Sequence, residues 1–562
     1  MENELEGGIV RRNRGGRGKG KGRGVDPRAL SEVQALLGGE PRRRDLLIEY
    51  LHRIQDRYGC LSAAHLVALA REMGLAMTEV YEVATFYHHF DVVKENGKAP
   101  PALTVRVCDS LSCEMAGANG LIGALKAALG DAVRVVPAPC VGRCEQAPVA
   151  VVGQNPVAAA TVERVRAAVK AKNTRCPVGT YIDYAAYRRE GGYRIAAECL
   201  SGKRDAETVI KAMEDSALRG LGGAGFPAGR KWRIVKAEPA PRLLAINIDE
   251  GEPGTFKDRY YLERDPHRFI EGALIAAWAV GIAEVYIYLR DEYAGCRAIL
   301  ERELAALRAD PPCPLPSIHL RRGAGAYICG EESAMIESIE GKRGMPRLRP
   351  PYVAQVGLFD RPTLEHNMET LHWVREILEK GGAWFASQGR HGRKGLRSFS
   401  VSGRVQKPGV HLAPAGITVR ELIDEYCGGM LPGHQFYGYL PGGASGGILP
   451  ASMGDIPLDF DTLNQYGCFI GSAAVIVLSD KDQASAAARN VMKFFSEESC
   501  GQCTPCRVGT GKALDLMRAP QWDQPLLEEL SVAMADASIC GLGQAAPNPI
   551  RCVMKYFPKE IE

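Results

Sequence analysis

The stretch that decides the fold is residues 220–232, GLGGAGFPAGRKW. Four of its glycines lie close together: Gly220, Gly222, Gly223 and Gly225. They satisfy the pattern GxGxxG, whose backbone N–H groups can approach a phosphate closely, and Lys231 adds a positive charge. The residues before the loop have a helical pattern where a Rossmann turn requires a strand. Taken alone, the stretch is either a phosphate-binding loop or an ordinary glycine turn.

Two further strings accompany this loop, NIDEGEPGTFKDR at 247–259 and GAGAYICGEES at 323–333. Together the three strings resemble the NADH- and FMN-binding 51-kDa-type subunit of respiratory NADH:quinone oxidoreductase. Its counterparts in soluble formate dehydrogenases and NAD-reducing hydrogenases also fit. The resemblance runs from about residue 175 to the C-terminus and implies an α/β domain that binds FMN and NADH.

Polar residues follow an apolar strand in the second string. Asn247, Asp249 and Glu250 stand at the end of LLAIN, where their polar groups are suited to hold the ribityl chain and ring edge of a flavin. The resemblance implies that the glycine loop and several later residues also border FMN. These are Gly220, Gly222, Gly223, Gly225, Lys231, Tyr327, Gly330, Glu331 and Asn367.

The third string ends at an expected helix start. Gly330, Glu331 and Glu332 begin that helix, whose dipole favours acidic side chains there. By the resemblance, NADH binds along the segment 346–352 and beside Phe226, which is placed to stack on a ring. The implied NADH-binding residues are Phe226, Glu252, Glu332, Arg349 and Tyr352, with Glu252 and Glu332 as the catalytic candidates.

Four positions depart from the respiratory pattern. Leu221 stands where respiratory members usually carry Arg, and His366 replaces the first of two Asn. Arg349 and Tyr352 replace Lys and Phe, and Arg and Lys are not equivalent beside a phosphate. The string RLRPPYVAQVGLFDRPTL at 347–364 most resembles the flavin subunits of formate dehydrogenases.

The first cysteine group consists of two pairs, Cys108 with Cys113 and Cys140 with Cys144. Each pair follows the end of an expected strand, so the four thiolates can converge on a zinc ion or a [2Fe–2S] cluster. Both spacings are looser than those of many structural zinc pairs, which favours the cluster.

Three strings around these cysteines strengthen this interpretation: VYEVATFYHHF (80–90), VCDSLSC (107–113) and PCVGRCEQAPV (139–149). They resemble the 24-kDa-type subunit of NADH:quinone oxidoreductase over residues 30–170. That family joins a helical bundle to a thioredoxin-like [2Fe–2S] domain. His88 and His89 are expected to be polar surface or boundary residues rather than ligands.

The second cysteine group is CxxCxxC at Cys500, Cys503 and Cys506, with Cys540 following in SICGLG. Three thiolates in one tight loop and a distant fourth suit a [4Fe–4S] cluster better than zinc, which more often uses two CxxC pairs. The other nine cysteines are expected to be buried, inert thiols: Cys60, Cys176, Cys199, Cys296, Cys313, Cys329, Cys427, Cys468 and Cys552.

The formal charge of +4 is concentrated in one segment. Residues 11–24 contain seven Arg or Lys, and the rest of the chain carries a net −3. Such a segment cannot bury apolar surface, so we expect a disordered tail, and nucleic-acid binding is the weaker alternative because no aromatic residues interleave the charges. The chain has no apolar run near the ~18 residues of a membrane span and no apolar N-terminal signal, which predicts a cytoplasmic protein.

The expected fold class is a multidomain α/β protein. A helical bundle and a thioredoxin-like [2Fe–2S] domain precede an FMN- and NADH-binding α/β domain, a β-grasp-like domain and a C-terminal helical [4Fe–4S] domain. The expected ranges are a basic tail at 1–27, the bundle at 28–95, the thioredoxin-like domain at 96–172, the FMN domain at 173–396, the β-grasp-like domain at 397–480 and the [4Fe–4S] domain at 481–562.

The resemblance predicts a diaphorase, in which hydride passes between nicotinamide C4 and flavin N5 and electrons pass singly through the clusters. The fusion of the two subunit types and the string at 347–364 favour a formate dehydrogenase, whose catalytic alpha subunit would carry a metal–pterin site with molybdenum or tungsten and further Fe–S clusters. NAD-reducing hydrogenase and respiratory subunits are the alternative partners. A rival of another class is a zinc scaffold whose basic tail binds nucleic acid, which would be colourless and free of flavin.

Overall fold

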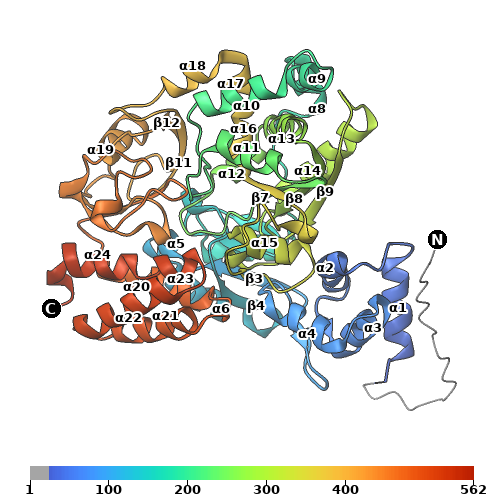
Figure 1. Ribbon diagram of the computed structural model, residues 1–562. Coiled ribbons are helices and arrows are strands. Elements are labelled where there is room, and N and C mark those ends of the chain that lie inside the picture. Colours follow the sequence, from blue (N-terminus) through green and yellow to red (C-terminus); the bar gives the residue numbers. More distant parts are fainter. Residues whose placement is uncertain (1–23) are drawn as a thin grey trace, which may run out of the picture.

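The structure is a computed structural model that describes residues 24–562 (Figure 1). The predicted basic tail therefore lies outside the described residues except for its last four positions. Pro27, predicted to belong to the tail, is already the first residue of helix α1 (Pro27–Leu37). Asp26 caps this helix by accepting from the N–H groups of Arg28 and Ala29, so the helix begins one residue before the predicted start.

Four helices form the N-terminal bundle, at the lower right of Figure 1. They are α1, α2 (Leu47–Tyr58), α3 (Ala63–Met73) and α4 (Met77–Phe86). Gly59 and Gly74 end α2 and α3 in the left-handed conformation, with φ of 77° and 65°. Glycine adopts this conformation without strain, so each of these helices ends at its glycine.

A small sheet domain follows, with the strand order β4-β3-β5-β6. Its elements are β3 (Thr104–Cys108), β4 (Arg134–Ala138), β5 (Ala150–Val152), β6 (Asn155–Val157), α6 (Ala118–Leu129) and α7 (Val162–Lys170). β3 runs parallel to β4 and antiparallel to β5. The strand β6 was not predicted, because three residues that include Pro156 have the pattern of a turn.

The central domain is built on four parallel strands in the order β10-β7-β8-β9. The strands are β7 (Arg242–Ile248), β8 (Ile282–Leu289), β9 (Ser317–Arg322) and β10 (Thr363–Asn367). The helices are α8 (Tyr184–Arg189), α9 (Arg194–Leu200), α10 (Ala206–Asp215), α11 (Ala228–Ala237), α12 (Lys257–Leu262), α13 (His267–Val280), α14 (Ala294–Ala309), α15 (Glu332–Ile339), α16 (Met368–His372), α17 (Val374–Lys380) and α18 (Gly382–Ala386).

Successive residues of β7 pack into two different apolar cores, one on each face of this sheet. Leu244 and Ile246 lie in the core that includes α13. Leu243 and Ala245 lie in the core shared with α15 and the N-terminal bundle. A strand buried on both faces is nearly continuously apolar, which explains the run LLAI between the polar residues Arg242 and Asn247.

The second sheet domain contains five strands in the order β12-β11-β15-β13-β14. They are β11 (Leu396–Gly403), β12 (Gly409–Pro414), β13 (Phe436–Leu440), β14 (Leu449–Pro450) and β15 (Ala474–Ser479). Residues 404–408 connect β11 to β12, which pair antiparallel. Apart from Leu396, these strands lie within the range predicted for the β-grasp-like domain.

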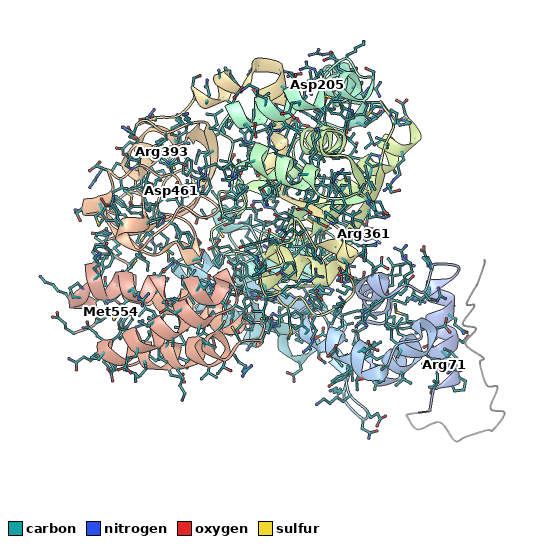
Figure 2. The ribbon with its side chains drawn as sticks, in the orientation of Figure 1. Arg71, Asp205, Arg361, Arg393, Asp461 and Met554 are labelled. Carbon is teal, nitrogen blue, oxygen red and sulfur yellow. The ribbon has the colours of Figure 1, made fainter. Side chains whose placement is uncertain are left out.

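The C-terminal bundle completes the fold, in red in Figure 1. Its helices are α20 (Ala484–Glu497), α21 (Thr504–Met517), α22 (Gln524–Ala537), α23 (Gly541–Ala545) and α24 (Asn548–Tyr556). Arg71 of α3 and Met554 of α24 lie on opposite sides of the molecule in Figure 2. Among residues 24–562, no helix is both long enough and apolar enough to cross a membrane.

Candidate functional site

The glycine loop closes on itself in front of a helix. The N–H of Gly220 donates to the carbonyl of Phe226 at 2.8 Å, and α11 begins two residues after Phe226. Within the described residues, the N–H groups at 222–224 have no acceptor in the protein. Gly225 has φ of 67°, and a Cβ there would lie 2.5 Å from the ring of Phe460, so this position requires glycine. Free N–H donors beside a helix N-terminus fit a phosphate group.

The carboxyl ends of two neighbouring strands lie beside this loop. Asn247 of β7 and Asn367 of β10 are register partners. A Cβ on Gly222 would lie 3.0 Å from the Cβ of Asn367, so the loop approaches that strand end closely. Asn247 Nδ2 donates to the carbonyl of Gly330 at 2.9 Å. The structure therefore brings the glycine loop, the strand ends and the third string to one edge of the sheet.

The two acidic residues after β7 have different surroundings. Asp249 Oδ2 is buried without a hydrogen-bond partner, and burial raises the pKa of this carboxyl well above its usual range. An unpaired buried polar atom at this edge fits a polar ligand such as a flavin. The Glu250 carboxylate instead accepts from the N–H groups of Asp258 (2.8 Å) and Arg259 (3.2 Å) and from the Tyr293 hydroxyl (2.8 Å). The side chain of Glu250, predicted to border FMN, thus fixes the start of α12.

The charge of Lys231 and the unusual His366 both have partners within the protein. Lys231 Nζ donates to the carbonyl of Glu365 at 3.0 Å and lies 3.2 Å from its carboxylate. His366 Nε2 accepts from Trp232 Nε1 at 2.7 Å. Burial lowers the pKa of His366 well below its usual range, so the neutral ring can act as this acceptor. The histidine at this departure from the respiratory pattern serves to hold α11 against β10.

The acidic pair in the third string shares one arginine. Glu331 is the N-cap of α15, and its carboxylate accepts from the N–H groups of Ser333 (2.9 Å) and Ala334 (3.0 Å). The predicted helix start is therefore confirmed. Arg349 forms ion pairs with the carboxylates of both Glu331 and Glu332, at 3.1 Å in the second case. By the resemblance, Glu331 borders FMN and Glu332 binds NADH. In the structure, both carboxylates pair with Arg349.

The remaining residues predicted to bind NADH fall into an exposed and an enclosed set. Phe226 is 39% exposed and Tyr352 is 56% exposed, and the guanidinium of Arg230 lies 5.6 Å from the Phe226 ring centre. Glu252 lies inside, where its carboxylate accepts from the N–H of Ser445 at 2.8 Å. Burial raises the pKa of Glu252 to about 7. Exposed aromatic rings are suited to stacking on a nucleotide base, and a carboxyl that titrates near neutrality is suited to proton exchange.

The first cysteine group converges beneath the central domain. All four thiols are buried: Cys108, Cys113, Cys140 and Cys144. The Sγ atoms of Cys140 and Cys144 lie 3.4 Å apart, and Cys108 is in hydrogen-bond contact with Cys113 and Cys140. Phe256, which lies in the second string just before α12, packs on Cys140 and Cys144. Four convergent buried thiols fit a [2Fe–2S] cluster.

Arginines of the central domain hold the loop that carries Cys140. Arg290 donates to the carbonyl of Cys140 at 2.6 Å, and Arg259 Nε donates to the carbonyl of Gly142 at 2.8 Å. Gly142 has φ of 67°, and a Cβ there would lie 2.2 Å from the Tyr293 hydroxyl. This cysteine site is therefore completed by contacts between two domains.

The second cysteine group surrounds one cavity. All four cysteines line it: Cys500, Cys503, Cys506 and Cys540. Ser499, Gln502 and Leu542 also line it, as do Ile328 and Pro346 from the central domain. Cys503 and Cys540 are the N-caps of α21 and α23. Helix N-termini favour thiolates, so this cavity fits a [4Fe–4S] cluster.

One short segment joins the flavin edge to this cavity. The 3-10 helix Tyr327–Gly330 contains Ile328, which lines the cavity, and ends at Gly330, whose carbonyl accepts from Asn247. The N–H of Tyr327 donates to Glu498 Oε2 at 2.9 Å, two residues before Cys500. The segment Tyr327–Gly330 thus borders both the predicted flavin site and the predicted [4Fe–4S] site.

Family profiles match four parts of the chain. The Nuo51 FMN-binding domain matches residues 213–376, and the thioredoxin-like [2Fe–2S] ferredoxin matches residues 33–173. The iron–sulfur binding region of NADH-ubiquinone oxidoreductase-F matches 486–562, and the SLBB domain matches 398–449.

Whole-protein comparison gives the family. The F 2 subunit of NADH-quinone oxidoreductase from Rhizobium meliloti is 40% identical over 405 residues, which are 69% of this chain and 96% of that protein. This chain belongs to the family of NADH-quinone oxidoreductase F subunits. Mitochondrial NADH dehydrogenase [ubiquinone] flavoprotein 1 from Dictyostelium discoideum is 43% identical over 373 residues, which are 63% of this chain and 78% of that protein.

A solved structure covers nearly all of this member of the F-subunit family. The NAD⁺-reducing [NiFe]-hydrogenase in the H₂-reduced state has a chain that is 30% identical, with a TM-score of 0.81, covering 92% of this chain and 93% of that chain. The predicted fold class and the predicted cofactors FMN, NAD(H), [2Fe–2S] and [4Fe–4S] are therefore confirmed. The chain is an NADH-binding flavin and iron–sulfur electron-transfer subunit, and the zinc alternatives are superseded.

A buried charge network beside the flavin edge was not predicted from the sequence. Lys257 Nζ lies 2.8 Å from Asp258 and 3.0 Å from Glu369, and Asn367 Nδ2 donates to Asp258 at 2.6 Å. The signal was present, because Lys257-Asp258 lies within the quoted second string. Glu498 was also missed, although its position just before the CxxCxxC loop made it a candidate.

Proposed function

We propose that this chain transfers electrons between NAD(H) and the metal–pterin catalytic subunit of a formate dehydrogenase. The observation that carries the electron-transfer part is the segment 327–330, which borders both the flavin edge and the cavity of the second cysteine group. When bound, FMN supplies the conversion between one hydride and two single electrons.

The residues at the flavin edge bind and orient. The free N–H groups at 222–224 hold a phosphate, and the start of α11 adds the favourable end of its dipole. Asn247 and Asn367 present fixed amides because each is hydrogen-bonded inside the protein. Asp249 follows directly after β7 and has one buried carboxyl oxygen without a partner.

We assign NADH to the exposed residues beside this edge. Phe226 and Tyr352 stack on the base, and Arg349 faces a phosphate while its charge is balanced by Glu331 and Glu332. Glu332 is the more exposed member of this acidic pair at 25%, against 16% for Glu331. Glu332 therefore lies where it can contact the nicotinamide, while Glu331 keeps the helix cap and the arginine in place.

The choice of partner rests on sequence. The string at 347–364 most resembles the flavin subunits of formate dehydrogenases, and the exposed Leu348 and Tyr352 belong to it. A hydrogenase partner is the second candidate, because the chain of an NAD⁺-reducing [NiFe]-hydrogenase matches this chain over 92% of its length. Respiratory complexes are the third, because the Rhizobium meliloti F 2 subunit matches it over 69% of its length.

Two measurements on the purified chain, with its FMN and iron content verified, test this function. NADH should reduce ferricyanide, whereas formate alone should leave the flavin oxidised. Adding the catalytic subunit should restore formate-dependent reduction of NAD⁺. Failure of NADH to reduce ferricyanide would overturn the NAD(H)–flavin assignment. Restoration by a hydrogen-oxidising partner in place of the formate partner would move the chain to the hydrogenase group.

The division of roles in the acidic pair is tested by two matched variants. Glu332→Gln should raise the apparent KM for NADH or lower turnover while FMN stays bound. Glu331→Gln should lower FMN retention and helix stability, because a capping carboxylate contributes roughly 0.5–2 kcal/mol. Loss of flavin from the Glu332 variant alone would reverse the assignment.

A further inference from the structure

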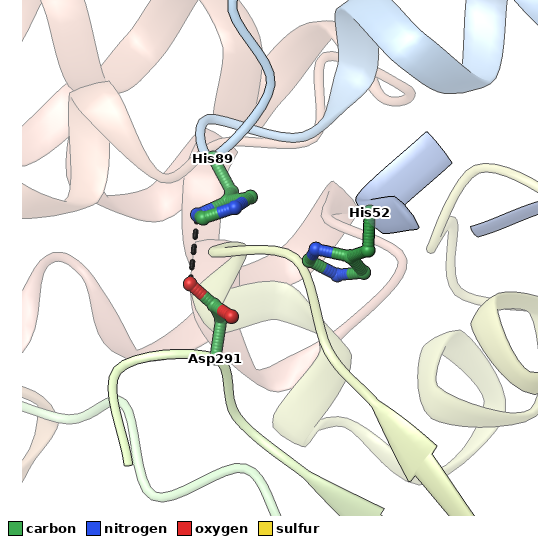
Figure 3. Close-up of side chains that lie close together, drawn as sticks. All are labelled: His52, His89 and Asp291. Atoms are coloured by element: carbon green, nitrogen blue, oxygen red, sulfur yellow. Dashed lines mark ion pairs between the residues drawn. The ribbon is translucent and has the colours of Figure 1, made fainter. Parts of the chain in front are cut away.

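Three side chains from distant segments converge where the N-terminal bundle meets the central domain (Figure 3). His52 lies in α2, His89 follows α4, and Asp291 follows β8. One ligand atom from each residue lies within 4.8 Å of those of the other two. His52 is 2% exposed, and the side chains of His89 and Asp291 are 15% and 11% exposed.

The hydrogen bonds of both histidines leave one ring nitrogen free. His52 Nε2 donates to the carbonyl of Gly323 at 2.9 Å, which leaves the lone pair on Nδ1. His89 Nδ1 donates to Asp291 Oδ2 at 2.7 Å, which leaves the lone pair on Nε2. Both remaining nitrogens are buried and have no hydrogen-bond partner. A buried unpaired nitrogen costs about 1–3 kcal/mol, so an occupant that binds Nδ1 of His52 removes one such cost.

Two carboxylates balance the arginine beside the cluster. Arg322 pairs with Asp291 Oδ1 and with Asp56, each at 2.6 Å. Asp56 therefore still balances the charge of Arg322 when an ion binds Asp291.

We propose that His52, His89 and Asp291 form a site for a divalent transition metal ion, with Zn²⁺ as the best match. Histidine nitrogens and a carboxylate are common zinc ligands, and a histidine that ligates metal usually donates its other N–H to a carbonyl or carboxylate. His52 shows that second bond, to Gly323, whereas the Nδ1–H of His89 donates to Asp291 itself, so the ion takes the place of this proton, which is released. Tetrahedral zinc places its ligands ~3.3 Å apart, which lies between the 2.7 Å that separates His89 Nδ1 from Asp291 Oδ2 and the 4.8 Å within which all three donors lie.

Such an ion ties two domains together beside the flavin edge. His52 and His89 belong to the bundle side, whereas Asp291 belongs to the central domain. The N–H groups of His88 and His89 donate to the carbonyls of Gly325 and Ala324 at 3.2 and 3.1 Å. This backbone leads directly into Tyr327, so the ion fixes the approach to the segment between the flavin edge and the second cysteine group.

Equilibrium dialysis against radioactive Zn²⁺ tests the site on chain whose clusters are intact, with iron and FMN measured on each sample. The unmodified chain should bind one Zn²⁺ that His52→Gln and His89→Gln bind at least ~10-fold more weakly. His319→Gln is the matched control, because His319 forms a similar pair with Glu284 at 2.9 Å outside the cluster. Equal zinc binding by all four proteins would overturn the proposal and leave water as the occupant.

A second measurement keeps the test decisive if a variant folds poorly. Diffraction from zinc-soaked crystals of the unmodified chain should show an anomalous peak at the zinc edge between the three side chains. Zn²⁺ should also raise the melting temperature of the unmodified chain and of His319→Gln, but not of the His52 variant. Absence of the peak would overturn the site whatever the variants do.

Discussion

The two cysteine groups of this chain differ in which parts of the chain surround and hold them. The [2Fe–2S] group is fully buried, and its loop is held by Arg259 and Arg290 of another domain. In the [4Fe–4S] group, three of the four cysteines are partly exposed, and all four belong to the C-terminal bundle. The first site depends on domain packing, whereas the second depends mainly on a local loop and two helix starts.

The largest expected effect separates the two clusters by substitution. Cys503→Ser should abolish the EPR signal of the reduced [4Fe–4S] cluster and leave the [2Fe–2S] signal, because the two groups share no ligand. Cys113→Ser is the reciprocal variant and should remove only the [2Fe–2S] signal. Persistence of both signals with unchanged iron in either variant would contradict the ligand assignment.

Exposure should also separate the clusters without any substitution. Cys500, Cys503 and Cys540 are partly exposed, whereas the whole first cysteine group is buried. An iron chelator should therefore remove the [4Fe–4S] iron in a first phase and the [2Fe–2S] iron in a slower one. Absorbance of the chelated iron, followed with EPR of the remaining cluster, gives the order. Loss of the [2Fe–2S] signal first would reverse the comparison.

A smaller effect tests the contacts that Arg259 makes with the loop of Cys140 and Cys144. Arg259→Gln should lower the stability of the [2Fe–2S] region by about 3 kcal/mol, because it leaves Glu145 without its buried partner, whereas Glu263 keeps its ion pair with Arg143. The expected readout is earlier loss of the [2Fe–2S] signal on heating, with FMN content unchanged. Arg264→Gln is the matched control, because Arg264 is exposed and stacks on Tyr260. Equal behaviour of the two variants would show that the contacts of Arg259 contribute little to the stability of the [2Fe–2S] region.

The smallest effect probes the enclosed carboxyl of Glu252 through pH. Glu252 binds its proton more tightly in the folded protein, because burial raises its pKa from 4.5 to about 7. Its contribution to the free energy of unfolding therefore falls as pH rises from about 4.5 to about 7, by roughly 3 kcal/mol in total. Glu252→Gln removes this loss, so the variant should gain melting temperature over the unmodified chain at pH 8 but not at pH 5. Glu190→Gln, which changes an exposed carboxylate, should show no such pH dependence.

Local patterns predicted most of the elements and the motif positions. The helix breaks at Gly59 and Gly74 and the start of α15 at Glu331 and Glu332 were predictable, because glycine conformation and helix capping depend on neighbouring residues alone. The strand β6 was not, because a three-residue strand with Pro156 forms only when β5 lies beside it.

The site was predictable as a set of motifs but not as a set of contacts. The sequence predicted Glu250 at the flavin edge but did not predict that its carboxylate binds the start of α12. The pairing of both Glu331 and Glu332 with Arg349 was also not predicted. These contacts join residues far apart in the chain, and the order of residues within a motif does not determine which distant charge reaches it.

The sequence by itself determined the chemistry of this protein: two sets of four thiols, a glycine loop and acidic strings whose residue types and spacing suit iron–sulfur clusters, a flavin and a nucleotide. Only the tertiary structure decided how these parts are connected. It places Tyr327–Gly330 beside both the flavin edge and the cavity of the second cysteine group. It also lets Arg259 and Arg290 hold the [2Fe–2S] loop. It brings His52, His89 and Asp291 together. The physical reason is that ligand chemistry belongs to side chains and short spacings, whereas burial and ion pairing are set by which distant surfaces pack.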